Sequence, residues 1–539
     1  MFGKSRLRSA VLCAALAFGV LAPASAHAVD VYVAQSAAGG NNGADCADAR
    51  AVGSLTSADW TAGNTIHLCG TITSAISAQG SGTSSSPVTI LFDSATKGQI
   101  AMPAIPNSGV LLLNNYNYIT VDGGGTGIIQ STNNGSPASI CPGSPYTNDV
   151  NNSTAIDVRS STGITIKNLT IGPLYYHVCT ADDGAVNIGL DAPGPVGIHY
   201  DAAASLTVDH TTMHDLGWAL WGYGNNITVS NDTFYNFDHG LAVGEVTSAG
   251  VSDGIYFFGN HLYNASVWDT DDNSFHHDGI HLYAYCSDGN SFCTGTYITN
   301  VYIYNNVFDG TWGNNVNSPV FFEENIQTAY VFNNYFNGSQ MVHWGVGMLE
   351  DMGAQVYTYN NTIAGYSTGD SNPAAFKFGG PTAVVKNNVV STANSLVTDS
   401  GTWVDGSADT MTMSNNIYAN GGSNAFVYCP PSGGSCSYLG NGSYSTWASD
   451  TGETAGSYSA SAGLNSAGIP QSGSPAIQAG ANLTSVCSGQ PNPGLGALCF
   501  DAAGNPRPTT GSWDAGAYNS TSSTALTPGA PTNLTAVVQ

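Results

Sequence analysis

The sequence predicts an all-β chain wound into a solenoid, a right-handed parallel β-helix. One observation is a short strand pattern that recurs as AIDVRS, GIHYDA, ALWGYG, GLAVGE and PVFFEE, starting at Ala155, Gly197, Ala219, Gly240 and Pro319. A second is a strand that ends in an Asn-rich turn and returns with a nearly constant period. A fixed period of strands without helical periodicity is typical of a solenoid. Parallel crossovers are right-handed in the great majority of proteins, which sets the expected hand.

The Asn-rich turn marks each coil. Its equivalent position is held by Asn168, His210, Asn231, Asn260, Asn305, Asn333, Asn360, Asn387 and Asn415, and the last five are 28, 27, 27 and 28 residues apart. Stacked coils place equivalent residues about 4.8 Å apart, so an Asn in each coil can hydrogen-bond its neighbours in the column. We therefore expect the Asn column to be structural and not catalytic.

The first 28 residues have the features of a secretory signal. Lys4, Arg6 and Arg8 precede an apolar run from Ala10 to Leu21, and small residues follow it. This pattern predicts a signal at residues 1–28, with cleavage before Val29. The apolar run is shorter than the roughly 20 residues of a spanning helix, and no later stretch reaches that length. We expect a secreted monomer without a membrane span, located outside the cell, in the periplasm or at the cell surface.

Ten cysteines follow the signal, and they fall into neighbouring couples. An even number in an exported chain favours disulfides that close local loops, although ten cysteines allow many connectivities. A zinc site is less favoured because the chain has no paired CxxC or CxxH spacing. The couples are Cys46 with Cys69, Cys141 with Cys179, Cys286 with Cys293, Cys429 with Cys436, and Cys487 with Cys499.

The charge balance restricts the partners. The chain has 10 Lys and Arg against 36 Asp and Glu, so its net charge is −26, and −29 once the three basic residues of the signal are removed. Nucleic acid is excluded as an expected partner because its recognition needs a basic surface. An acidic polysaccharide would also be repelled unless a cation such as calcium bridged it.

In chain order, an N-terminal region from Val29 to about Thr71 precedes the first regular coils, SSPVTILFD and YNYITVDGG. The segment NTIHLCGTIT, the Asn-Asn turns and the closing stretch GNPRPTTGSWDAGAYN resemble the secreted parallel β-helix proteins of the pectate-lyase-like group. The resemblance implies a single β-helix domain at residues 29–519, with a cap at its N-terminal end. It selects no single activity, because the group includes lyases, hydrolases, epimerases and binding proteins. Residues 520–539 have the Ser/Thr/Pro composition of a disordered tail.

Chemistry in a solenoid is expected where outward side chains of neighbouring coils gather. The first predicted outward column is Asp157, His199, Trp221, Ala242, His281, Phe321 and His343. The second is Arg159, Asp201, Tyr223, Gly244, Tyr283, Glu323 and Gly345. Titratable residues are densest around positions 278 to 343, to which the loop VWDTDDNSFHHD adds Trp268, His276 and His277. We predict the functional site in this region.

Cleavage of a sugar polymer needs a proton donor, a base or nucleophile, and aromatic faces that hold the sugar ring. We predict Glu323 as the acid, Asp278 or Glu324 as the carboxylate that activates water, and His281 or His343 as the residue that tunes the acid. The predicted substrate-binding residues are Trp221, Tyr223, Trp268, His277, Tyr283, Phe321 and Lys377.

A narrower resemblance supports these roles. The order HDGI, FFEEN, VHWG and FKFGG is similar to the motif order of the polygalacturonase family. On that resemblance Asp278, Glu323, Glu324, His343 and Lys377 would be the functional positions of an inverting glycoside hydrolase. The chain departs from the family pattern because His276 and His277 replace its Asn-Thr, two Glu replace its two Asp, and Ala375 replaces its Arg.

Two alternatives remain open at this point. A polysaccharide lyase needs a base, for which His281 or Tyr283 would serve, and a cation that stabilises the enolate-like charge. Calcium would be that cation, held by the acidic residues Asp269, Asp271, Asp272 and Glu245. The other alternative is a non-catalytic glycan-binding or adhesin-type β-helix, which the Ser/Thr/Pro tail favours.

Overall fold

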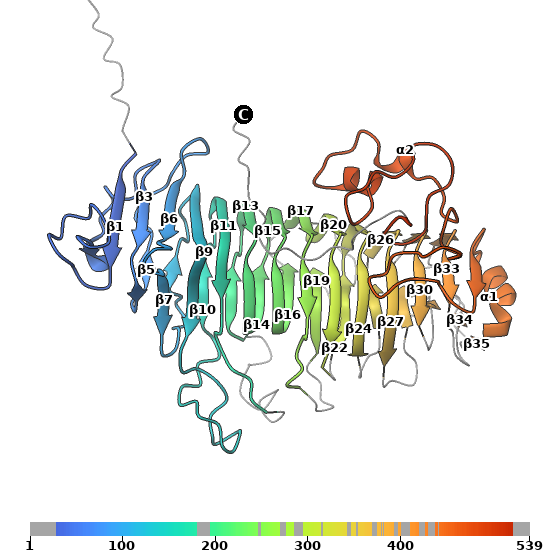
Figure 1. Cartoon of the computed structure of the whole chain (residues 1–539), viewed down its shortest axis with the longest axis horizontal. Helices are drawn as coiled ribbons and strands as arrows, with labels where there is room; N and C mark the ends of the chain where they lie inside the picture. The colour runs from blue at the N-terminus through green and yellow to red at the C-terminus, as the bar shows by residue number, and fades with distance from the viewer. Residues whose placement is uncertain are drawn as a thin grey trace, which may run out of the picture.

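The chain forms a parallel β-helix in which short strands stack along one long axis (Figure 1). This fold confirms the predicted class. The computed structural model describes residues 28–179, 194–245, 250–269, 276–284, 295–313, 316–341, 346–351, 354–368, 374–378, 380, 382–392, 397–399, 410–419, 426–428, 437–439 and 441–520. The predicted signal and most of the predicted tail lie outside these residues. No helix among them is long and apolar enough to cross a membrane.

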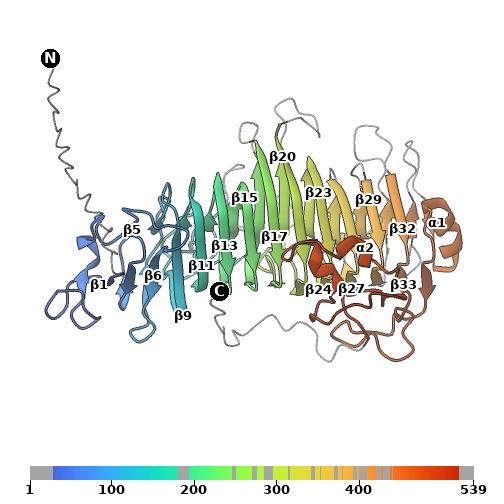
Figure 2. The same cartoon turned by 90° about the horizontal axis from the view of Figure 1, so that it is seen from above.

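Strand pairing divides each coil into three faces, which we call faces 1, 2 and 3. Face 1 stacks β1 (Asp30–Ala34), β3 (Thr65–Leu68), β6 (Val88–Phe92), the first parts of β9 (Ile119–Ser131) and β11 (Thr162–Ile171), β13 (Ala203–Asp209), β15 (Gly224–Ser230), β17 (Val251–Phe258), β20 (Tyr297–Tyr304), β23 (Ile326–Phe332), β26 (Ala354–Tyr359), β29 (Thr382–Lys386) and β32 (Thr410–Ser414). These strands form the ladder that runs along the molecule in Figure 2.

Face 2 stacks β4 (Thr71–Ile72), β7 (Gln99–Met102), the second parts of β9 and β11, the first parts of β14 (Thr212–Gly222) and β16 (Thr233–Glu245), β18 (His261–Tyr263), β21 (Val307–Thr311), β24 (Tyr335–Met341), β27 (Thr362–Thr368), β30 (Val389–Thr392), β33 (Ile417–Ala419) and β36 (Ser457–Ser459).

Face 3 stacks β5 (Ile76–Ser77), β8 (Leu111–Leu112), β10 (Thr154–Asp157), β12 (Val196–His199), the second parts of β14 and β16, β19 (His277–Ala284), β22 (Val316–Glu324), β25 (Val346–Asp351), β28 (Ala374–Phe378), β31 (Val397–Asp399) and β34 (Phe426–Tyr428), which β35 (Ser437–Leu439) joins antiparallel. The pairing of β34 with β35 ends the parallel stack on this face.

The space between the faces is filled by apolar side chains, one column per inward position. On face 3, for example, Ile198, Leu220, Leu241, Ile280 and Val320 are fully buried and pair in register from coil to coil. Burial of each such side chain stabilises the fold by about 1.5–3 kcal/mol, before the entropy of folding is subtracted. The sequence alternation therefore fixes which residues point outward, and that is what positions a site on face 3.

The Asn turns form two columns, and the sequence assignment is wrong for one residue. The first Asn of each turn, such as Asn305 and Asn333, has a left-handed backbone with a φ of 55°. The second Asn forms the buried hydrogen-bonded ladder, in which Nδ2 of Asn306 donates to Oδ1 of Asn334 at 3.0 Å. Asn260 belongs to this second column, because Gly259 takes the left-handed position before it with a φ of 69°.

The two ends of the coil are closed by different structures. At the N-terminal end β2 (Arg50–Ala51) and the short helix η1 (Val52–Ser54) lie beside β1. At the C-terminal end η3 (Asn441–Ser443) and α1 (Tyr444–Thr451) cover the last coil, with Trp447 fully buried against Phe426.

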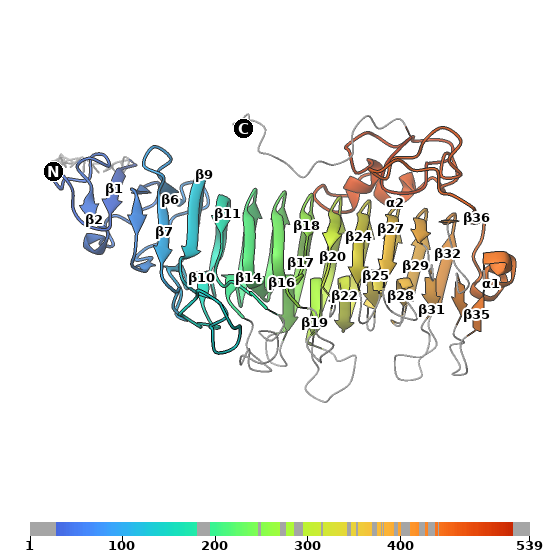
Figure 3. The ribbon, with the colours of Figure 1, turned by 60° about the horizontal axis from the view of Figure 1, so that its bottom comes forward.

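The chain then folds back along the outside of the coil through α2 (Thr484–Cys487) and η4 (Leu495–Cys499), as Figure 3 shows. Nδ2 of Asn333 donates to the carbonyl of Phe500 at 2.9 Å, and Nδ2 of Asn387 donates to that of Ala481 at 2.9 Å. The returning segment therefore covers the corner between faces 1 and 2.

Three of the predicted disulfides are present, and two couples cannot be compared. The bonds join Cys46 to Cys69, Cys141 to Cys179, and Cys487 to Cys499. The couples Cys286 with Cys293 and Cys429 with Cys436 lie outside the described residues.

Candidate metal centre

The candidate site lies on face 3, where β16 and β19 run side by side. His239 pairs in register with Asp278, and Ala242 pairs with His281. Between these positions Gly240 and Gly279 face the interior, where a Cβ on Gly279 would lie 2.5 Å from the carbonyl oxygen of Pro319. A Cβ on Gly240 would likewise lie 2.5 Å from the carbonyl oxygen of Gly279, so the two glycines let these strands pack closely beside His239 and Asp278.

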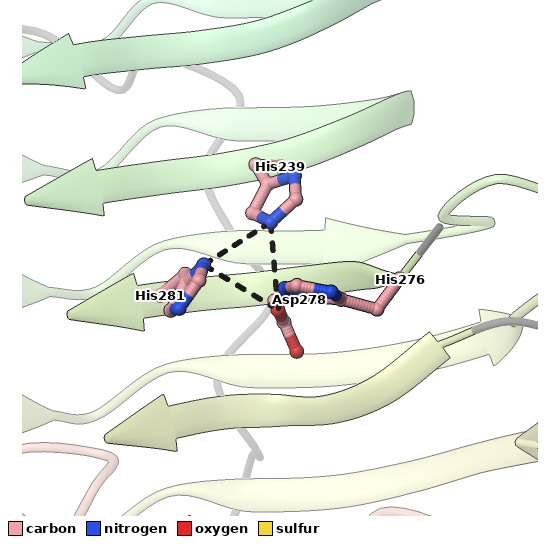
Figure 4. A group of neighbouring side chains, drawn as sticks. All are labelled: His239, His276, Asp278 and His281. Atoms are coloured by element: carbon pink, nitrogen blue, oxygen red, sulfur yellow. Dashed lines mark hydrogen bonds and ion pairs between the residues drawn. The ribbon is translucent and has the colours of Figure 1, made fainter. Parts of the chain in front are cut away.

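Four side chains converge there, as Figure 4 shows. Their ligand atoms all lie within 4.8 Å of one another: Nε2 of His239, Nε2 of His276, Oδ2 of Asp278 and Nδ1 of His281. Oδ2 of Asp278 is 3.4, 3.6 and 3.7 Å from the nitrogens of His239, His276 and His281, and the nitrogens of His239 and His281 are 3.3 Å apart. We call these four residues the His-Asp cluster.

Four of the six separations in the cluster, at 3.3–3.7 Å, are close to the edges of a coordination tetrahedron. A tetrahedral ion with bonds of about 2.0–2.2 Å to nitrogen and oxygen has its ligand atoms about 3.3–3.6 Å apart. Oδ2 of Asp278 and Nε2 of His276 are buried and have no hydrogen-bond partner among the described residues. Three imidazoles and one carboxylate suit zinc or another transition metal, whereas calcium prefers oxygen ligands alone. The His-Asp cluster therefore fits a divalent transition metal.

Carboxylates behind the cluster set the tautomers of two histidines. Nδ1 of His239 lies 3.0 Å from Oδ1 of Asp238, and Nε2 of His281 lies 3.0 Å from Oε2 of Glu323. Each ring therefore donates an N–H to its carboxylate, and its other nitrogen faces the cluster. The backbone N–H of Ser318 donates to Oδ1 of Asp278 at 3.2 Å, which leaves Oδ2 to face the histidines.

His277 is buried behind the cluster and points away from it. Its Nδ1 contacts Oδ1 of Asp238, and its Nε2 lies 2.8 Å from Oδ2 of Asp269. An imidazole between two carboxylates is stabilised in its charged form. This buried chain from Asp269 through His277 and Asp238 to His239 fixes the position of the first ligand.

The pKa values of two histidines of the cluster are shifted in opposite directions. Burial opposes a charge on His239, but Asp238 and Asp278 outweigh it and raise the pKa of His239 to about 9. Burial lowers the pKa of His276 to about 4, with a smaller contribution from the two neighbouring histidines. Burial would raise the pKa of Asp278, but its close contact with His239 and the charges of the surrounding imidazoles lower it. His276 is therefore neutral and Asp278 ionised at neutral pH, as metal ligands must be, whereas His239 is protonated and would release a proton when a metal binds.

Aromatic rings surround the cluster. Trp218 packs on His239 and Phe321 on His281, with ring centroids 4.5 and 4.8 Å apart. Tyr283 crosses over Gly244, and its hydroxyl accepts a hydrogen bond from Nε1 of Trp221 at 3.3 Å. His239, Asp278 and His281 are buried next to these rings, and low exposure to water strengthens electrostatic interactions within the cluster.

The structure brings together several of the predicted catalytic residues and separates others. Asp278 and His281 are in the cluster, and Glu323 contacts His281. The first outward column has the predicted register from Asp157 to Phe321, but its next member is Glu350 and not His343, which is a correction. His343 itself lies outside the described residues.

The second outward column also needs correction. A register shift between Leu282 and Tyr283 pairs Tyr283 with Glu324 and not with Glu323. The bulge turns Glu323 toward His281, so its carboxylate is a neighbour of the cluster. Of Glu324 the structure describes only the backbone.

The predicted substrate-binding residues have different surroundings. Trp221, Tyr283 and Phe321 lie beside the cluster, and Tyr223 is half-buried next to Trp221 in sequence. Trp268 is buried and stacks on His177 at 3.8 Å, while His277 is the buried residue described above. Lys377 pairs with Glu350 through its backbone, and its side chain is outside the description.

The predicted calcium ligands do not form a described group. The carboxylate of Asp269 is buried against His277. Asp271, Asp272 and the side chain of Glu245 lie outside the described residues, so the calcium set remains a prediction.

Two residues with central positions, His239 and Asp238, were absent from the predicted site. The pattern search began this strand at Gly240, one residue after His239. A signal was present, because Asp-His-Gly-Leu at 238–241 and His-Asp-Gly-Ile at 277–280 are related motifs one coil apart. Recognition of this pair would have placed His239 beside Asp278.

No protein-family model and no curated protein sequence matches the chain. Among solved structures, a complex of XylC with xylose is similar at 10% identity and a TM-score of 0.40, over 73% of this chain and 84% of that one. GH136 lacto-N-biosidase from Eubacterium ramulus has 12% identity and a TM-score of 0.40, over 67% and 63%.

DFA-IIIase from Arthrobacter chlorophenolicus A6, in complex with GF2, has 10% identity and a TM-score of 0.36, over 68% of this chain and 75% of that chain. A rhamnogalacturonan lyase has 12% identity and a TM-score of 0.34, over 72% and 87%. Likeness at this level concerns the fold and does not identify the reaction of this chain.

Proposed function

We propose that the chain is a secreted carbohydrate-active enzyme that cleaves a polysaccharide with the help of a divalent transition metal. The observation that carries the proposal is the convergence of the ligand atoms of His239, His276, Asp278 and His281, which all lie within 4.8 Å of one another. The aromatic residues beside the cluster support a sugar substrate, because aromatic faces pack on sugar rings.

The geometry favours elimination over the predicted hydrolysis. An inverting hydrolase needs two carboxyl groups about 6.5–9.5 Å apart with water between them. Asp278 is fully buried, with Oδ1 bonded to Ser318 and Oδ2 directed at the histidines, and Glu323 is engaged by His281. Neither is placed as a free acid or base on the surface.

A bound cation would supply what elimination requires. It would neutralise a uronate carboxylate and stabilise the negative charge that develops when the proton beside it is removed. Tyr283, whose ring lies 4.9 Å from that of His281, would be the base that takes this proton, and the C–O bond to the leaving sugar would break with its electron pair going to oxygen. It would also offset the repulsion between an acidic polysaccharide and a chain of net charge −26. We therefore propose an acidic polysaccharide as the substrate and a lyase as the reaction class.

The test combines metal content with product analysis. The purified protein is assayed for bound zinc, manganese, iron and copper, and incubated with acidic and neutral polysaccharides before and after chelation. Ultraviolet absorbance reports unsaturated products and a reducing-end assay reports all cleavage. We expect absorbance that chelation abolishes, and a loss of at least about 100-fold in His239→Ala, since ligand removal abolishes metal binding.

His261→Ala is the matched control, because His261 pairs with Asp309 on face 2, away from the cluster. It is expected to keep full activity. New reducing ends without absorbance, unaffected by chelation, would instead identify a metal-independent hydrolase and refute the proposal.

A further inference from the structure

We infer that His276 is an exchangeable ligand of the proposed metal, and that a substrate oxygen takes its place during the reaction. The inference rests on the proposed function for the identity of that oxygen, but its metal chemistry can be tested separately. It follows from a difference between His276 and the other three members of the His-Asp cluster.

The first difference is exposure. The side chains of His239, Asp278 and His281 are 4%, 0% and 5% exposed, whereas that of His276 is 37% exposed. Solvent therefore comes nearest to the cluster on the His276 side. An incoming ligand would meet His276 before it met the other three.

The second difference is the hydrogen bonding of each ligand residue to groups outside the cluster. His239 is held by Asp238, His281 by Glu323, and Asp278 by the backbone N–H of Ser318. For His276 the supporting nitrogen would be Nδ1, because Nε2 faces Asp278 at 3.6 Å, and Nδ1 makes no hydrogen bond among the described residues. Such outer contacts typically add 10–100-fold to metal affinity, and His276 has none described.

The third difference is the backbone. His239 belongs to β16, and Asp278 and His281 belong to β19, so parallel ladders hold all three. His276 precedes β19, whose pairing with β22 begins only at His277 and Val316. Its ring contacts those of His239, His281 and Phe321 only edge to face, at centroid distances of 5.3–6.0 Å. Rotation of His276 would break no described ladder pairing.

The consequence is a site with both closed and open forms. Structural zinc sites have four protein ligands, whereas catalytic sites have three and keep one position for water or substrate. His239, Asp278 and His281 provide the three permanent ligands, two imidazoles and a carboxylate. The position of His276 then accepts an oxygen of a carboxylate or hydroxyl group, the groups that a uronate sugar offers.

His277 explains why only one residue of the His-His pair can move. Its ring is 2% exposed and lies between Asp238 and Asp269. Asp269 and Asp238 thus anchor the chain one residue after His276. The anchored His277 provides a fixed hinge next to the proposed exchangeable ligand.

The test measures metal binding in the full-length mature protein. Zn²⁺ and Co²⁺ are titrated calorimetrically into metal-free wild type, His276→Ala, His276→Gln and His239→Ala, and thermal unfolding confirms that each variant is folded. We expect both His276 variants to bind one ion with an affinity within about 10-fold of wild type. We expect His239→Ala to lose at least about 100-fold in metal affinity, because His239 is a ligand held by Asp238.

The visible spectrum of the Co²⁺ forms reports the vacated position. Acetate and imidazole are added as probes, since each offers one ligand atom of the expected class. We expect both to change the spectrum of His276→Ala at lower concentration than that of wild type. Equal loss of metal affinity in the His276 and His239 variants, or no response to the probes, would show a closed structural site and overturn the inference.

These outcomes are distinct from failure of the proposed function. A wild-type protein that binds neither ion would refute both proposals. A protein that binds metal in a closed site and still cleaves polysaccharide by elimination would refute only the role of His276.

Discussion

At the scale of single residues, Asp232 is the exception in the buried Asn ladder. Its backbone N–H donates to Oδ1 of Asn260, and its Oδ1 accepts from the backbone of Thr211, as ladder members do. Its Oδ2 occupies the place of an amide nitrogen but has no hydrogen-bond partner among the described residues. Burial accordingly raises the pKa of Asp232 well above its usual value.

We expect Asp232→Asn to stabilise the protein by about 1–3 kcal/mol at neutral pH, because an amide would satisfy a buried position that now lacks a donor. The gain should shrink toward pH 4, where the carboxyl group is protonated and can donate itself. Chemical denaturation of both proteins at the two pH values measures it. Asn334→Asp is the reciprocal control and should destabilise the same ladder by a similar amount.

Glu453 closes the other end of the ladder and predicts a second pH effect. Nδ2 of Asn416 and the hydroxyl of Tyr418 donate to its Oε2 at 2.8 and 3.0 Å, yet burial raises its pKa to about 7. The native state therefore holds a proton that the unfolded state releases nearer pH 4.5, so the contribution of this group to stability falls as the pH rises toward 7.

Thermal unfolding of wild type and Glu453→Gln between pH 5 and 8 checks this sign. The two proteins should have similar midpoints at pH 5, where both side chains are neutral, and the Gln variant should be more stable at pH 8. A constant difference across this range would contradict the raised pKa.

Still at the residue scale, the residues of the candidate site could be predicted only where inward and outward side chains alternate regularly along a strand. Asp278 and His281 lie in a segment rich in titratable residues, and the register that stacks His281 under Phe321 followed from the repeat. His239 was missed because the recurring strand pattern, read here as GLAVGE, begins at Gly240, one residue after it. The contact of Glu323 with His281 depends on a bulge after Leu282, which no sequence period signals.

At the scale of elements, close packing at Gly240 of β16 and Gly279 of β19 decides whether the His-Asp cluster can form. A Cβ on Gly279 would lie 2.5 Å from the backbone oxygen of Pro319 and 3.1 Å from the ring of Trp312. We expect Gly279→Ala to destabilise the fold by about 1–3 kcal/mol and to weaken metal binding, because β19 must move away from β22. Denaturation and zinc titration measure the two effects.

Gly442→Ala is the matched control, since a Cβ there meets no atom within 4 Å. It should leave both quantities unchanged. Full metal affinity in Gly279→Ala would mean that the cluster does not depend on the close packing at Gly279.

The strands themselves were predictable from period and alternation, and the exceptions have local causes. Gly259 takes over the left-handed position that Asn holds in later coils, which displaces the assignment at Asn260 by one residue. The helix α1 interrupts the repeat at the last coil, where Trp447 fills the open end of the core.

At the scale of the whole molecule, the returning C-terminal segment was beyond sequence analysis, because its partners lie far away along the chain. Arg507 connects it to the coil. Its Nη2 donates to Oδ1 of Asn333 at 2.9 Å and to the carbonyl of Gly516 at 3.0 Å, and its Nη1 donates to Oδ1 of Asn519 at 3.2 Å. One planar guanidinium thus satisfies acceptors from the coil and from its own segment.

We expect Arg507→Ala to cost about 2–5 kcal/mol, because several buried acceptors lose their donor at once. The effect should be graded along the molecule, since stability in a solenoid is carried by contacts between neighbouring coils. Limited proteolysis should cut the segment from 461 to 520 before the coils around the His-Asp cluster. Arg507→Lys keeps the charge without the planar fork and should fall between Ala and wild type. If the variants instead lost zinc binding and the C-terminal segment together, the segment and the distant cluster would belong to one cooperative unit, and the coil would not be a sum of neighbouring contacts.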